Sequence, residues 1–164
     1  MKDLIDRVRK GTAAIAALQP RVQAGEPWPL STQFGTEPEA SWGPPETLAH
    51  VAEMLPFWLG EIERILAGPA ATPVPFGRVA ADQLRIGIIE RDRSLPVGEL
   101  FARIEAGAAR FTSRLSQLSA ADAAREGAHP RLGPLTVRQV ADRFVASHLE
   151  EHVEQLKAIL AERH

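Results

Sequence analysis

The stretch VRQVADRFVASHLEEHVEQLKAILAE, residues 137–162, is the part of the chain that best indicates how it folds. Its apolar residues recur at intervals of three and four, which is typical of a helix with one buried face. Thr136 and Gln139 form a capping-box pattern at its start. The stretch therefore predicts a long amphipathic helix from about Val137 to Glu162.

Three earlier segments repeat this apolar spacing. They run from about Asp3 to Gln23, from about Pro44 to Ala67 and from about Pro96 to Leu118. Prolines cluster between the segments, and proline interrupts helices because it lacks an N–H and clashes with the preceding turn. We expect Pro56 to bend the second helix and Ser94 to cap the third.

Four long amphipathic helices, without a convincing alternating strand pattern, predict an all-α fold. We expect a four-helix bundle in which residues 1–164 form one domain. The first and second connections are long, about residues 24–43 and 68–95, so long crossovers should replace a simple up-down-up-down order. The stretch 79–91 is ambiguous and fits a short extra helix over the second connection.

The composition of the 164-residue chain excludes several kinds of chemistry. There is no cysteine, which excludes disulfides, thiolate zinc sites, iron–sulfur clusters and a cysteine nucleophile. Lys plus Arg is 19 and Asp plus Glu is 21, so the net charge is 19 − 21 = −2, which does not indicate a nucleic-acid or anionic-membrane partner. The N-terminal residues resemble neither a signal peptide nor a membrane anchor, and we expect a cytoplasmic protein.

His148 and His152 are the most informative pair of residues in the chain. Residues four apart share a helix face, and a uniform step of about 100° puts both in the middle of the apolar face. A buried ring nitrogen without a partner costs about 1–3 kcal/mol. Chelation of one metal ion by both side chains removes this cost and is the interpretation we favour. The alternative is that each is a core histidine bonded to a carboxylate or a carbonyl.

His50 on the second segment is the candidate third ligand, at the edge of a wide apolar arc. Three protein ligands and an open position are typical of a catalytic metal. Gln155 and Glu151 flank the histidine pair and are expected to orient a ligand imidazole or a water, the alternative being that they point to solvent. Glu53, one turn after His50, is a weaker candidate of this kind because its wheel position leans toward solvent.

Three stretches resemble one known family. They are SWGPPETLAHV (residues 41–51), HPRLGPLTV (129–137) and SHLEEHVEQL (147–156). In this order they resemble the DinB/YfiT-like superfamily, in which a Trp-containing segment leads into helix two. That helix carries one histidine, and the last helix carries a His-x-x-x-His pair, often followed by Gln.

The resemblance implies a four-helix bundle with an unusual helix order and a divalent metal on three histidines. His50, His148 and His152 match the ligand positions, and Gln155 matches the polar position that follows. The superfamily includes thiol-S-transferases that use small thiol cosubstrates, mycothiol-dependent isomerases and damage-inducible proteins without an assigned activity. Many members are homodimers.

The leading hypothesis is therefore a metal-dependent transferase that uses a low-molecular-weight thiol cosubstrate, or a related hydrolase acting on a small molecule. Zinc is the expected ion, with Ni, Mn and Fe as alternatives. A rival hypothesis is a non-enzymatic helical module that binds a ligand or partner through Trp28, Phe34 and Trp42, although we expect these aromatics to cap the core. A carboxylate-bridged di-iron bundle is disfavoured, because it needs Glu-x-x-His where this chain has His50-x-x-Glu53.

Other charged residues receive no firm role. His129 and His164 are left unassigned, and His129 is expected in a surface loop. Arg85, Glu90 and Arg91 could line a pocket for an anionic substrate, but a solvated charge cluster is the favoured interpretation.

Overall fold

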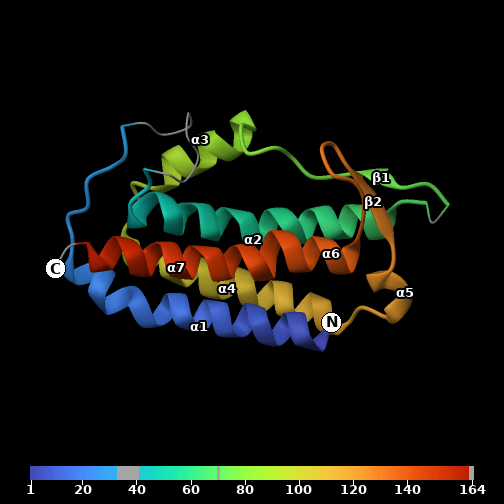
Figure 1. Cartoon of the computed structure of the whole chain (residues 1–164), viewed down its shortest axis with the longest axis horizontal. Helices are drawn as coiled ribbons and strands as arrows, with labels where there is room; N and C mark the ends of the chain where they lie inside the picture. Colours follow the sequence, from blue (N-terminus) through green and yellow to red (C-terminus); the bar gives the residue numbers. More distant parts are fainter. Residues whose placement is uncertain (33–40, 70, 163–164) are drawn as a thin grey trace.

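The computed structural model describes residues 1–32, 41–69 and 71–162 (Figure 1). Helix α1 spans Lys2–Ala24, and the apolar positions that predicted it are buried. One of these positions is a glycine, Gly11, which allows close packing of the last helix. A Cβ atom at Gly11 would lie 2.8 Å from Cδ2 of Leu149.

Helix α2 spans Pro44–Ala67, the bounds predicted from the sequence. Proline at the first helical position costs no hydrogen bond, because the N–H groups of the first turn have no partner within the helix. Glu46 stabilises this start by accepting a hydrogen bond from the backbone N–H of Gly43 (3.1 Å). The helix continues through Pro56 to its end.

Helix α3 spans Gln83–Asp92, and α4 spans Val97–Ser116. The extra helix expected between residues 79 and 91 therefore forms, and it packs against α2. The predicted capping of α4 by Ser94 is wrong. Its N-cap is Pro96, without a side-chain hydrogen bond, because the residues before it form the turn that ends α3.

The final helix is continuous but contains one π-helical turn. It consists of α6 (Val137–Ala141), the π-helical segment η1 (Asp142–Ala146) and α7 (Ser147–Ala161). The capping box forms as predicted, with Thr136 and Gln139 bonded reciprocally at 2.8 and 3.1 Å. The expectation of one uniform α-helix is wrong, because the N–H of Ser147 donates to the carbonyl of Asp142, five residues earlier.

The four long helices form a bundle in which sequence neighbours are not all spatial neighbours. Helix α1 packs between α4 and α7, and α2 packs against the same two helices from the other side. Figure 1 shows that α1 and α7 run in one direction and that α2 and α4 run in the opposite direction. This arrangement confirms an all-α bundle whose order differs from up-down-up-down.

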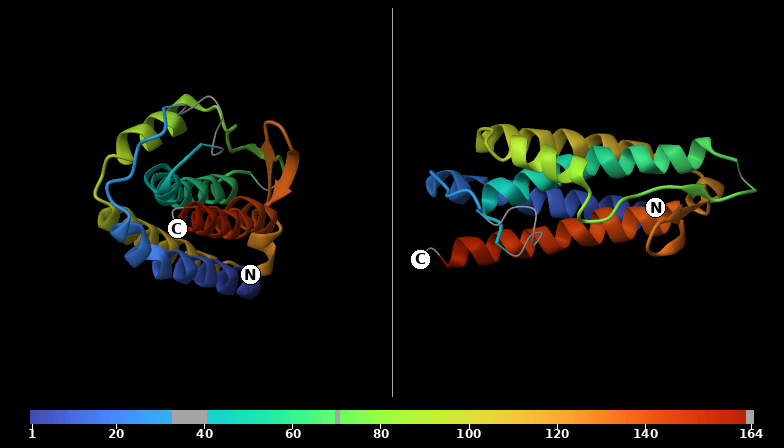
Figure 2. Two further views of the ribbon diagram at one scale, coloured as in Figure 1. Left: turned by 60° about the vertical axis from the view of Figure 1, so that its left-hand side comes forward. Right: turned by 90° about the horizontal axis from the view of Figure 1, so that it is seen from above.

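A small sheet at one end of the bundle was not predicted. Strand β1 (Val74–Pro75) pairs in parallel with β2 (Glu126–His129), which forms an antiparallel hairpin with β3 (Gly133–Thr136). The short helix α5 (Ala120–Ala123) precedes it. Figure 2 shows the hairpin against the last helix, and α3 over α2. Within the described residues, no helix has the length and apolarity needed to cross a membrane.

Candidate metal centre

Three histidines from α2 and α7 converge between these helices. Nε2 of His148 lies 3.0 Å from Nε2 of His50 and 3.1 Å from Nε2 of His152. His50 and His152 are buried, at 3% and 2% exposed, whereas His148 is partly exposed. The structure thus brings together the three side chains that the sequence suggested as ligands.

The outward-facing nitrogens of the α7 pair contact oxygen acceptors. Nδ1 of His148 lies 3.0 Å from a carboxylate oxygen of Glu151, and Nδ1 of His152 lies 2.8 Å from the amide oxygen of Gln155. An ionised carboxylate and an amide oxygen can only accept, so each Nδ1 carries the hydrogen. A neutral imidazole then has a lone pair on Nε2. Two lone pairs therefore face each other across 3.1 Å.

This arrangement is unfavourable unless a cation lies between the nitrogens. A proton is disfavoured, since burial lowers the pKa of His50 well below its usual value. Burial and the neighbouring His148 lower the pKa of His152 to about 3. A divalent ion fits better, because two nitrogens bound about 2.0–2.1 Å from one tetrahedral zinc lie about 3.3–3.4 Å apart, close to the separations of the histidine nitrogens.

Glu53 lies on the far side of His50 from the other two histidines. Its position on a helical wheel of α2 predicted a side chain that leans toward solvent. That prediction is wrong, because the Glu53 side chain is only 7% exposed. Arg78, from the connection between β1 and α3, covers it, with Nη2 2.5 Å from the carboxylate. The same carboxylate oxygen lies 3.9 Å from Nδ1 of His50, which is too far for a hydrogen bond.

The aromatic side chains of the first connection that the structure describes pack on the bundle. Trp42 is 4% exposed, and its ring stands edge-on to His50 with the centroids 5.5 Å apart. The indole N–H of Trp28 donates to the carbonyl of Val22 at 2.8 Å. Phe34 lies outside the described residues.

His129 is a buried residue rather than the surface-loop histidine that we expected. It lies on β2, 6% exposed, with its ring stacked on Phe144 at a centroid distance of 5.2 Å. Its Nδ1 accepts from the backbone N–H groups of Arg131 and Leu132, both at 3.3 Å. His129 therefore supports the π-helical segment from the sheet. His164 lies outside the described residues.

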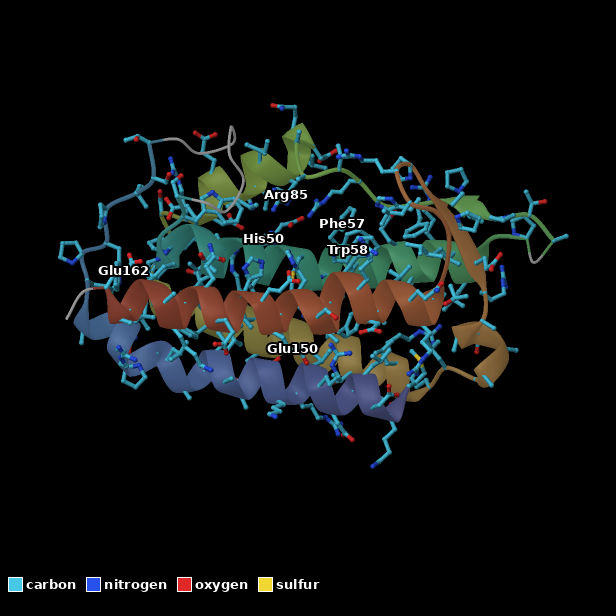
Figure 3. All side chains as sticks on the ribbon, in the orientation of Figure 1. His50, Phe57, Trp58, Arg85, Glu150 and Glu162 are labelled. Atoms are coloured by element: carbon cyan, nitrogen blue, oxygen red, sulfur yellow. The ribbon has the colours of Figure 1, made fainter. Side chains whose placement is uncertain are left out.

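A cavity of about 330 Å³ adjoins two of the three histidines. His50 and His148 line it, together with Trp58, Phe144 and three arginines. Figure 3 labels His50 and Trp58 on α2 and Arg85 between α2 and α3. The interpretation of Arg85 as part of a solvated cluster is wrong, because it is 5% exposed, whereas Glu90 and Arg91 are exposed.

Sequence reasoning missed several residues of this cavity. Arg78 lies between β1 and α3, where no helical face indicates the direction of a side chain. Arg143 falls on the polar face of the predicted last helix, which suggests solvent rather than a cavity. Trp58 and Phe144 were read only as apolar stripe residues, but their rings stack at 4.2 Å beside the histidines. The spacing along α2 could have indicated Trp58 as a residue near the site, because it lies about two turns after His50 and so on a similar side of the helix.

Comparison with known proteins agrees with this architecture. No curated protein matches the chain. The family model of the DinB superfamily matches residues 5–156, which include all four long helices of the bundle and the three histidines. The chain therefore belongs to the DinB superfamily.

Proposed function

We propose that this protein is a metal-dependent enzyme in which His50, His148 and His152 bind one divalent ion. The observation that carries the proposal is the convergence of their three Nε2 atoms, two of them held as lone-pair donors by Glu151 and Gln155. An all-nitrogen ligand set favours zinc, nickel or iron over magnesium or calcium. Zinc is the ion we expect, with manganese a weaker alternative.

We further propose a transferase that uses a low-molecular-weight thiol, or a related hydrolase. The bound ion supplies Lewis-acid chemistry, either stabilising a thiolate or lowering the pKa of a water to about 7. The chain contains no cysteine, so any reacting sulfur must belong to a cosubstrate. The adjoining cavity offers room for that cosubstrate next to the partly exposed His148.

The residues around the histidines have supporting tasks in this proposal. Glu151 and Gln155 hold the outer N–H groups, so the ring orientations are set before an ion binds. Trp42 packs on His50 and restricts water on the buried side. Substrate access is therefore expected from the cavity side.

Metal analysis tests the first part of the proposal. Protein purified without added chelator should contain about one equivalent of metal by plasma mass spectrometry, and His148→Ala should lose it while remaining helical by circular dichroism. Undiminished metal in His148→Ala would contradict the assignment. The reaction class is tested separately by incubating the zinc-loaded protein with small thiols and electrophiles, with His148→Ala as the inactive control. Ester hydrolysis without thiol dependence would favour the hydrolase.

A further inference from the structure

The cavity beside the three histidines is lined by more positive than negative side chains. Its arginines are Arg78, Arg85 and Arg143, and the acidic residue of the lining is Glu151. These arginines come from the β1–α3 connection, from α3 and from η1, so three separate elements direct guanidinium groups at one cavity.

Arg85 is the most buried of the three and is held in place. Its Nη1 donates to the carbonyl of Ala80 at 3.0 Å, and its guanidinium lies 5.5 Å from the ring of Trp42. Arg85 lines the same cavity as His50 and His148, so it lies close to the proposed metal centre.

The other two arginines extend this positive region in different ways. Arg78 is paired with Glu53 and its guanidinium lies 3.6 Å from the ring centroid of Phe57, so it is fixed in position and partly neutralised. Arg143 is exposed at the cavity mouth. The lining therefore includes one buried guanidinium that is held in position and one that is exposed to solvent.

An aromatic surface forms another part of the lining. Trp58 and Phe144 stack with an interplanar angle of 8° and a centroid separation of 4.2 Å. His129 stacks on the other side of Phe144, which fixes this ring from the sheet. The cavity therefore combines an apolar surface with guanidinium groups, as suits a small organic anion.

We propose that this cavity binds the anionic group of a small organic substrate, a carboxylate, phosphate or sulfonate, through Arg85 and Arg143, while the apolar part contacts Trp58 and Phe144. The inference names the substrate class of the proposed enzyme and rests on that function for the reaction itself. Guanidinium groups bind such anions through paired hydrogen bonds. The volume of about 330 Å³ limits the ligand to a small molecule.

Benzoate and its neutral isostere benzamide test the inference by isothermal titration calorimetry on zinc-loaded and chelator-treated protein. In both forms, benzoate should bind at least about tenfold more tightly than benzamide, because hydrogen bonds to charged groups are the strong ones. Arg85→Gln should weaken benzoate about tenfold and leave benzamide unchanged. Arg91→Gln is the matched control on the same helix, because its side chain is 70% exposed outside the cavity, and it should bind both probes like the wild type.

A second variant keeps the test decisive if Arg85→Gln does not fold. Arg143→Glu reverses an exposed charge at the cavity mouth and should weaken benzoate severalfold, more strongly at low salt. Equal affinities for benzoate and benzamide would overturn the inference, as would wild-type benzoate binding in the folded arginine variants. Benzoate binding that needs zinc but neither arginine would overturn it and leave the metal proposal intact. Arginine-dependent binding in protein that takes up no metal would support the anion site and contradict the proposed function.

Discussion

Nε2 of His148 lies 3.1 Å from Nε2 of His152, although each ring directs its Nδ1 at an oxygen acceptor. Hydrogen bonding among the histidines does not explain this arrangement. His148 Nε2 also contacts Nε2 of His50 at 3.0 Å, and one ring nitrogen cannot be a good partner for both neighbours. Because Glu151 and Gln155 accept the Nδ1 hydrogens, the Nε2 atoms of His148 and His152 are left with lone pairs that can bind a cation.

Removing the acceptor of His152 should weaken metal binding. Gln155→Leu removes the oxygen 2.8 Å from its Nδ1, and loss of such a partner weakens metal binding about 10- to 100-fold. Glu151→Gln should cost less than about threefold, because the amide still offers an oxygen to His148. Chelator competition measures both, with the exposed Glu154→Gln as the control expected to match the wild type. Equal affinities for Gln155→Leu and wild type would show that this contact does not orient the ring.

Zinc should stabilise the folded chain in a way that depends on the three histidines. At a free zinc concentration 100 times the dissociation constant, the free energy of unfolding should rise by about 2.7 kcal/mol. Thermal unfolding with and without zinc measures this, and His148→Ala should show no such increase. Magnesium, which prefers oxygen ligands, should have no effect on either protein. An equal zinc effect in His148→Ala would place the ion elsewhere.

The stability of the metal-free protein should fall as the solution becomes acidic, and His129 should contribute. Burial lowers the pKa of His129 in the folded state. Because an unfolded histidine titrates near 6.5, the unfolded chain binds more protons below that pH. The stabilisation is therefore complete above about pH 6.5 and is lost as the pH falls toward the folded pKa.

His129→Asn separates this titration from the structural role of the side chain. An asparagine oxygen can accept from the N–H groups of Arg131 and Leu132, as Nδ1 now does, but it does not titrate. The variant should be less stable at pH 7.5, since it loses the stack on Phe144, yet its stability should fall less steeply between pH 7 and 5. Urea unfolding across this range gives the comparison. An unchanged slope would mean that His129 titrates alike in both states.

The long helices could be predicted because their evidence is local. In α1 each buried apolar position follows the helical repeat from Leu4 to Val22, and in α2 the prolines at the start and Gly68 at the end mark the bounds. The histidine cluster could be suggested for the same reason, because His148 and His152 share a face by spacing alone. His50 was a weaker candidate from its own position, because its contact with His148 joins residues 98 positions apart, and the family resemblance added support.

The parts that were missed depend on contacts between distant segments. Strand β2 reads Glu-Gly-Ala-His, which lacks strand alternation, and Gly127 is there because a Cβ atom would lie 2.7 Å from Ile65 on α2. The π-helical segment has ordinary helical residues, and the additional residue shows only in the backbone hydrogen bond from Ser147 to Asp142. The step of about 100° per residue assumes a uniform helix, so it identifies the right pair of histidines but not their angle relative to the residues before the π-helical segment.

A buried carboxylate at the start of α2 should be needed to place His50, which lies one turn later. Glu46 is fully buried and accepts from the backbone N–H groups of Ser31 (2.7 Å) and Gly43 (3.1 Å) and from Arg93 (3.1 Å). Glu46→Gln replaces one acceptor oxygen with an NH₂ group that would face a donor. It also removes the carboxylate charge that pairs with the partly buried Arg93.

Such a change should lower the free energy of unfolding by about 3 kcal/mol, since breaking a buried ion pair from one side costs about 3–5 kcal/mol. Glu63→Gln is the matched control, because Glu63 pairs with Arg114 at the surface and is 44% exposed. It should change stability by less than about 0.5 kcal/mol. Urea unfolding compares the two, and the zinc affinity of Glu46→Gln should fall while that of Glu63→Gln stays at the wild-type value. Equal stability losses in both variants would show that the Glu46 network does not fix the start of α2. An unchanged zinc affinity in a destabilised Glu46→Gln would show that His50 is positioned by its contacts with Trp42 and α7 instead.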